Sequence, residues 1–161
     1  MPHIASARPG WQLVCQELGY GYIDPRWSIE AILTAIRHSE VLISEALHGA
    51  IVADAMRIPW IAVQSNELIL SLKWRDWCAS IEVDYEPTYL LPYWLPNRDC
   101  NFYRRCRNWG RRKRVELDLL RIGRLSASKL SRDGRLAELK DQLWRRLDIL
   151  RSDIASNGYT G

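Results

Sequence analysis

VLISEALHGAIVADAMRIPWIAV, residues 41–63, places a helix-forming segment between two short apolar runs. The runs 41–43 and 60–63 are too short for helices, and a proline precedes the second, so both predict buried strands. Residues 46–56 are rich in helix formers, with apolar residues spaced as on a helix that packs on a sheet. This order predicts a βαβ unit with parallel strands and a right-handed crossover.

A polar cluster follows the first of these strands and consists of Ser44, Glu45, His48 and Gly49. Open α/β sheets bind ligands at the carboxyl ends of their strands, and a helix amino terminus offers free N–H groups to an anion. The glycine permits close approach of a ligand, and an imidazole can bind an oxyanion or transfer a proton. The cluster therefore predicts an anion-binding site, with His48 as its first candidate.

Other residues and other roles stay open at this site. His48 is also compatible with a partly buried helix histidine, and Glu45 with a carboxylate that caps the helix through its dipole. His3 would emerge at the same edge of the sheet if residues 1–5 form a strand. Lys73 would supply positive charge for a phosphate or carboxylate, although charged helix residues are more often only solvated.

The alternation of strands and helices extends toward the amino terminus. Pro9 suits the first turn of a helix that ends at Gly19, and Ser28 caps a second helix that runs to about His38. With strands predicted at 1–5, 20–23, 41–44 and 60–63, the pattern favours the α/β class, as a Rossmann-like parallel sheet with flanking helices.

The pattern changes after residue 63. Asn66 is the predicted cap of a helix through about Ser80, and residues 81–85 are a predicted edge strand. Three prolines make residues 86–97 an extended linker. The predicted domains are a Rossmann-like α/β domain over 1–85, this linker, and a basic helical region over 98–161.

Charge is distributed unevenly along the chain. Residues 1–97 carry six Lys and Arg against eleven Asp and Glu, whereas residues 98–161 carry seventeen against eight. The run 98–114 alone has eight basic residues and one acid. A basic region of this kind suits anionic lipid, nucleic acid or an anionic sugar carrier, although such runs are usually a solvated face or a docking surface, and nucleic acid is not the expected partner.

The remaining signals exclude several classes of protein. No apolar run is long enough to span a membrane and no signal-peptide pattern is present, so the predicted location is the cytoplasm, with the inner membrane surface as an alternative. The four cysteines lack CxxC spacing, which predicts neither a zinc site nor a disulfide framework. The chain has no GxGxxG, P-loop or HExxH motif, and no metal site is expected.

SEALHGAIVADAMRIPWIAV, followed by LKWRDWCAS, resembles the carboxyl-terminal half of the polysaccharide pyruvyl transferases, most of all the succinoglycan-type branch. The resemblance runs from His3 to about Tyr85. It implies half of a two-domain fold like that of the GT-B glycosyltransferases. It also implies transfer of a pyruvyl group from phosphoenolpyruvate to two sugar hydroxyls as a cyclic ketal, without a cofactor, in exopolysaccharide biosynthesis. His48 matches the motif histidine at the donor site, and Lys73 falls where a basic residue would neutralise the donor.

Departures from the family pattern set further expectations. Ala46 stands where many relatives have an arginine. The resemblance implies an amino-terminal domain or partner subunit and a polysaccharide or lipid-linked oligosaccharide as acceptor, so a fragment is expected, and its exposed cleft surface favours self-association. Two alternatives stay open: half of a GT-B glycosyltransferase that uses a nucleotide-sugar, and a non-enzymatic module that binds anionic polymers or membranes through residues 98–114.

Overall fold

A computed structural model describes residues 1–65, 70–91 and 102–156. The chain divides into two compact units, residues 1–130 and residues 131–161. The elements of the first unit, in chain order, are α1 Pro9–Glu17, α2 Ile29–Arg37, β1 Leu42–Ser44, α3 Leu47–Ala55, β2 Trp60–Gln64, α4 Ser71–Ser80, β3 Thr88–Tyr89 and α5 Phe102–Leu125. The second unit contains α6, Arg135–Ser156.

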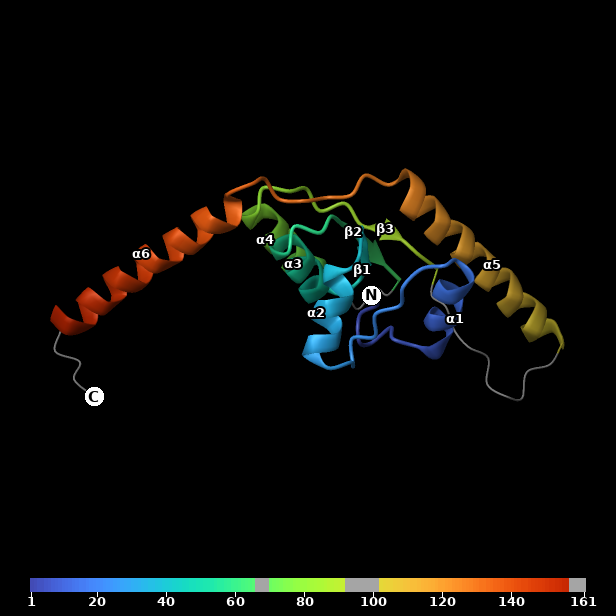
Figure 1. The fold of residues 1–161 in the computed structure, drawn as a ribbon. Helices are drawn as coiled ribbons and strands as arrows, with labels where there is room; N and C mark the ends of the chain where they lie inside the picture. The colour runs from blue at the N-terminus through green and yellow to red at the C-terminus, as the bar shows by residue number, and fades with distance from the viewer. Residues whose placement is uncertain (66–69, 92–101, 157–161) are drawn as a thin grey trace. The chain divides into compact units, whose positions relative to one another are not determined.

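The three strands form a parallel sheet in the order β1, β2, β3 (Figure 1). Leu42 of β1 is in register with Trp60 of β2, and Val63 of β2 is in register with Thr88 of β3. The helix α3 connects β1 to β2 and contacts both strands. The predicted α/β class and the predicted parallel βαβ unit are therefore confirmed.

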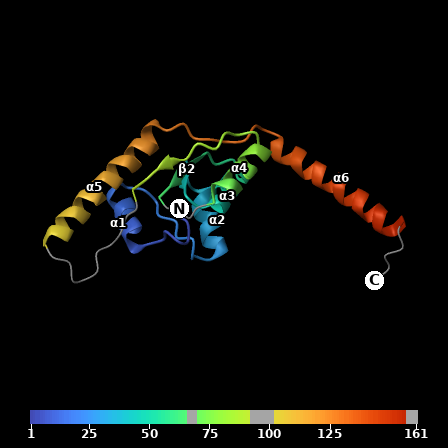
Figure 2. The same cartoon turned by 180° about the vertical axis from the view of Figure 1, so that it is seen from behind.

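Helices cover both faces of this sheet, with α2, α3 and α4 on one side and α1 and α5 on the other (Figures 1 and 2). Side chains of β2 alternate between the two layers, as the pleat of a strand requires. Trp60 contacts Trp74 and Trp77 of α4, with ring centroids 6.0 and 5.1 Å away. Ile61 and Val63 belong instead to the cluster shared with α1 and α5.

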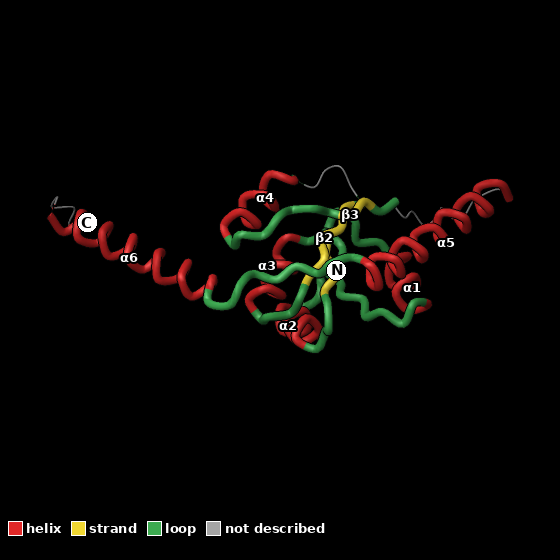
Figure 3. The backbone as a smooth tube through the Cα atoms, turned by 90° about the horizontal axis from the view of Figure 1, so that it is seen from above, coloured by secondary structure: helices red, strands yellow, loops and turns green. Residues whose placement is uncertain are grey.

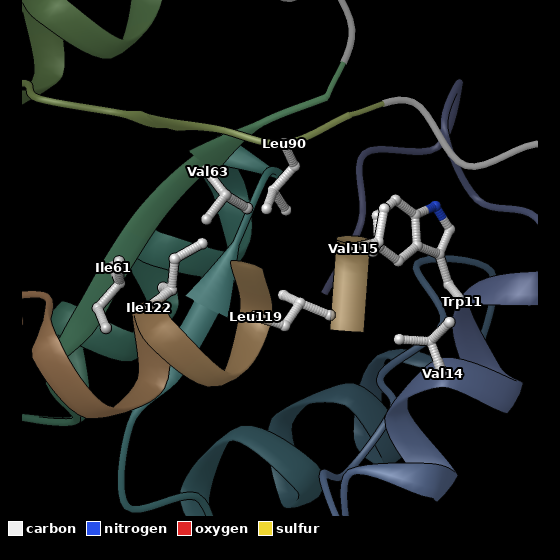
Figure 4. Close-up of a cluster of buried hydrophobic side chains, with 8 residues drawn as sticks. All are labelled: Trp11, Val14, Ile61, Val63, Leu90, Val115, Leu119 and Ile122. Atoms are coloured by element: carbon white, nitrogen blue, oxygen red, sulfur yellow. The ribbon is translucent and has the colours of Figure 1, made fainter. Parts of the chain in front are cut away.

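That second cluster joins segments that are far apart in the sequence (Figure 4). Its members are Trp11 and Val14 of α1, Ile61 and Val63 of β2, Leu90, and Val115, Leu119 and Ile122 of α5. Burial of a large aliphatic side chain contributes about 1.5–3 kcal/mol to folding. The carboxyl-terminal half of α5 is thus part of the first compact unit, while the predicted domain boundaries after residues 85 and 97 stay predictions.

Several basic residues of α5 are engaged in ion pairs. Arg112 pairs with Glu17 of α1 and with Glu116, and Lys113 pairs with Glu116 at 2.6 Å. Arg114 lies 3.3 Å from Asp118. These acids neutralise part of the predicted basic run, which weakens the case for an anion-binding surface along this stretch.

Helix boundaries follow the predicted signals. Pro9 lies in the first turn of α1, and Gly19 follows this helix with a φ of 69°, a conformation that glycine adopts at little cost. The Ser28 side chain accepts a hydrogen bond from the Ala31 N–H at 3.3 Å and caps α2. The predicted cap Asn66 lies outside the described residues. The helix α4 begins at Ser71, later than predicted.

Three predicted strands are wrong. Residues 1–5 pair with β1 only through Met1, and the chain then turns, with the Ser6 N–H bonded to the His3 carbonyl at 2.9 Å. Residues 20–23 belong to no strand. Residues 81–85 leave α4 through a turn, in which Glu82 has a φ of 60°.

The edge strand is instead β3, inside the predicted linker. Figure 3 shows β3 beside β2. Thr88 and Tyr89 are in register with Val63 and Gln64, and this pairing satisfies the free edge of β2. Within the described ranges, no helix is both long and apolar enough to cross a bilayer.

Candidate functional site

The candidate site lies where β1 ends and α3 begins. Ser44 is the last residue of β1, Glu45 and Ala46 form the connection, and Leu47 opens α3. The carboxyl end of β2 lies beside it, because the two strands are parallel and Ser44 is in register with Ala62. This is the edge at which open α/β sheets bind ligands.

Glu45 connects three segments at this edge. Its side chain is only 3% exposed. One carboxylate oxygen accepts hydrogen bonds from both the backbone N–H and the hydroxyl of Ser65, each at 2.7 Å. The other accepts the His3 N–H at 3.0 Å. Sequence reasoning missed Ser65, whose one available signal was its position just after the second buried strand.

Ser44 and Gly49 are buried together beneath the turn. The Ser44 hydroxyl donates to the Ala46 carbonyl at 2.8 Å. A Cβ added to Gly49 would lie 2.7 Å from the Met1 sulfur and 2.9 Å from the Ser44 hydroxyl oxygen. The absent side chain at position 49 therefore lets α3 approach β1 closely, and the predicted approach of a ligand at this glycine stays a prediction.

Gly49→Ala is expected to lower the free energy of unfolding by roughly 1–3 kcal/mol, because the new methyl group forces α3 away from β1. Urea denaturation followed by circular dichroism measures the change. Gly110→Ala is the matched control, since a Cβ there meets no atom within 4 Å and alanine favours a helix. A Gly49→Ala protein as stable as the Gly110→Ala protein would contradict this account.

His48 differs from Glu45 in its surroundings. It is the second residue of α3 and is exposed to solvent. Within the described part of the chain, its imidazole makes no hydrogen bond or ion pair, and no side chain caps the first turn of α3. An imidazole and the N–H groups of a helix amino terminus are thus available together at one place.

The remaining predicted site residues divide into two groups. His3 lies beside Glu45 through its backbone, and its ring Nδ1 accepts the Ala5 N–H at 3.2 Å. Lys73 is an exposed residue of α4, and no described contact joins it to the cluster. The described contacts therefore join Ser44, Glu45, Gly49 and His3, and the role of Lys73 stays a prediction.

A cavity of about 740 Å³ borders the cluster on the α1 and α5 side of β1. Glu45 and Ser65 are among the residues that line it, and Tyr22 and Trp27 add aromatic surface. Burial raises the pKa of Tyr22 to about 12. Near it, a bidentate pair with Arg26 lowers the pKa of Asp24 to about 2.

The described residues also bear on metal binding and on thiol chemistry. Among them, no three His, Cys, Asp or Glu side chains gather as metal ligands would. Cys78 is buried, which raises the pKa of its thiol to about 11, and burial likewise raises the pKa of the half-buried Cys15. Neither thiol is activated for nucleophilic attack, because activation requires a lowered pKa.

A parallel sheet with covering helices, and with its polar cluster at the carboxyl edge, defines a Rossmann-like α/β domain. Residues 12–67 match the sequence model of the polysaccharide pyruvyl transferase family. This segment contains most of α1 and all of α2, β1, α3 and β2, and with them Ser44, Glu45, His48 and Gly49. The predicted resemblance to that family is confirmed over this segment.

One curated relative extends the comparison. The chain is 43% identical over 88 residues to the succinoglycan biosynthesis protein ExoV of Rhizobium meliloti (strain 1021). The match covers 54% of this chain and 28% of ExoV, so the chain corresponds to little more than a quarter of its relative's length. No solved structure matches the chain.

Proposed function

We propose that this chain provides the donor side of a pyruvyl transferase of exopolysaccharide biosynthesis. The proposed reaction moves a pyruvyl group from phosphoenolpyruvate to two hydroxyls of a polysaccharide or lipid-linked oligosaccharide. The observation that carries the proposal is the exposed His48 on the uncapped first turn of α3, within the segment that matches the family. An amino-terminal domain or a partner subunit would supply the acceptor side.

The donor chemistry suits this turn. Phosphoenolpyruvate carries a phosphate and a carboxylate, and the N–H groups of a helix amino terminus bind such anions with the help of the helix dipole. His48 would lie against the bound donor from the same turn. Lys73 is proposed to add positive charge from α4, where it is exposed.

The proposed reaction proceeds in balanced steps. Protonation of the methylene carbon of phosphoenolpyruvate leaves an electron-poor C2, which one sugar hydroxyl attacks with loss of its proton. The bond from C2 to the phosphate oxygen then breaks, inorganic phosphate leaves, and the second hydroxyl closes the ketal with loss of its own proton. His48 has two open roles, as the donor of the first proton or as a ligand of the phosphate.

The other cluster residues would act by shaping the turn. Glu45 holds the β1–α3 connection through His3 and Ser65, and Ser44 and Gly49 set the distance between α3 and β1. In the proposal these residues position His48. Glu45 acts on the reaction through this contact network, unless its carboxylate reaches the substrate from the neighbouring cavity.

Thermal-shift titration of the 161-residue protein tests donor binding without requiring turnover. Phosphoenolpyruvate is expected to raise the melting temperature, because a ligand that binds only the folded state stabilises it. His48→Ala should remove most of this shift, whereas the exposed Glu40→Ala variant should keep it. Stabilisation by nucleotide-sugars but not by phosphoenolpyruvate would favour the glycosyltransferase alternative, and no response to either would contradict donor binding.

A further inference from the structure

The helix α6, Arg135–Ser156, carries an apolar stripe that its own unit leaves uncovered. The helix has 22 residues, about 33 Å in length, and none of its side chains is buried. Leu143 and Leu150 are 58% and 53% exposed. The stripe consists of Leu136, Leu139, Leu143, Leu147, Leu150 and Ile154.

The charges of α6 are sorted around this stripe. At 100° per residue, Lys140 and Arg151 border one edge of it and Arg146 borders the other. Trp144 lies beyond the edge that Lys140 and Arg151 occupy. The acids Glu138, Asp141 and Asp148 lie on the opposite face, and Asp153 is the exception near the helix end. The stripe is thus bordered mainly by cations.

We propose that α6 is a docking surface for an anionic lipid bilayer and lies in the plane of its interface. In this arrangement the leucines enter the boundary between headgroups and acyl chains. Lys140, Arg146 and Arg151 bury their methylene stems and extend their charges to lipid phosphates. Trp144 takes the position at headgroup level that tryptophan favours. The proposal rests on α6 alone and does not depend on the proposed transferase activity.

Two features favour a bilayer over a second copy of the helix. The stripe advances in steps of 3, 4, 4, 3 and 4 residues. Their mean is the 3.6-residue period of a straight helix rather than the 3.5 of a coiled coil. In addition, two stripes placed face to face would bring Lys140, Arg146 and Arg151 against the same cations of the other copy, and like charges there repel. A flat anionic surface fits both the straight course of the stripe and the positive charges along its edges.

Vesicle co-sedimentation of the full 161-residue chain tests the proposal. The chain is expected to bind vesicles that contain phosphatidylglycerol and to ignore vesicles of phosphatidylcholine alone. A Leu143→Asp/Leu147→Asp double variant and a Lys140→Glu/Arg146→Glu/Arg151→Glu triple variant should each bind at least about tenfold more weakly. Arg145→Glu is the matched control, because Arg145 lies on the face opposite the stripe, and its binding should be unchanged.

Several results would overturn the proposal. One is the absence of binding to anionic vesicles. Another is binding that survives the Leu143→Asp/Leu147→Asp change, which would assign it to the basic residues of α5. If Arg145→Glu weakened vesicle binding as much as the triple variant does, binding would depend on net charge and not on the residues that border the stripe. Sedimentation equilibrium that reveals a dimer abolished by Leu143→Asp/Leu147→Asp would assign the stripe to a second copy. Circular dichroism and thermal unfolding verify that each variant keeps the fold of residues 1–130.

Discussion

His48→Ala is expected to lower pyruvyl transfer by about 10²–10⁴-fold in an intact two-domain enzyme that carries this chain, with the fold unchanged. This is the range that a positioned proton donor contributes to a reaction. His48 is exposed and its imidazole makes no hydrogen bond, ion pair or ring contact within the described residues, so its removal leaves no unpaired partner. Release of inorganic phosphate measures turnover, and circular dichroism verifies the fold.

Two further variants sharpen this test. His48→Gln keeps hydrogen-bonding capacity but cannot transfer a proton at neutral pH. It should therefore retain affinity for phosphoenolpyruvate if His48 is a phosphate ligand, and lose turnover if His48 is the proton donor. His38→Ala is the control, because that histidine ends α2, where its Nδ1 lies 2.8 Å from the Thr34 carbonyl oxygen. Unchanged turnover in His48→Ala would remove this residue from the mechanism.

Glu45→Ala is expected to lower the free energy of unfolding by roughly 3 kcal/mol. The substitution removes the carboxylate that accepts three hydrogen bonds. The His3 and Ser65 N–H groups at the sheet edge then lose this acceptor. A fully buried donor without a partner costs about 1–3 kcal/mol, and because His3 and Ser65 are half-buried, each of their donors contributes toward the lower end of that range. A loss of this size is a large part of the total stability of a small domain. Urea denaturation measures it directly.

Controls separate this structural effect from chemistry. Glu40→Ala removes an exposed carboxylate and should change the free energy of unfolding by no more than about 0.5 kcal/mol. Ser65→Ala removes only the hydroxyl bond, for a loss of about 1 kcal/mol. If Glu45→Ala were as stable as Glu40→Ala, the hydrogen bonds would not stabilise the turn. If the Glu45→Ala protein kept its stability but lost pyruvyl transfer, Glu45 would act on the substrate itself.

The βαβ unit at the centre of the chain could be predicted because its signals are local. Short apolar runs, a segment of helix formers and Pro59 lie within the unit itself, and β1, α3 and β2 fall within a residue or two of their predicted bounds. The strand β3 could not be predicted in this way. Thr88 and Tyr89 follow a proline in a stretch with linker composition, and they form a strand because β2 offers a free edge.

The same distinction between local and tertiary information applies to the candidate site. Ser44, Glu45, His48 and Gly49 were predicted from their position between a strand and a helix. The burial of Ser44, Glu45 and Gly49 and the exposure of His48 depend on tertiary contacts, which the spacing of residues in the sequence does not reveal. Ser65 approaches Glu45 only because β1 and β2 are parallel and adjacent. The burial of Gly49 depends in the same way on Met1, which is distant in sequence.

The cluster around β2 also constrains how the protein is made. Trp11 and Ile122 belong to one core, although more than a hundred residues separate them. A ribosome must therefore synthesise nearly the whole of residues 1–130 before this face of the sheet can close, and contacts of such long range form slowly. Until then, Ile61 and Val63 offer an apolar surface to other nascent chains. The nascent chain therefore depends on protection of this surface until α5 has been made.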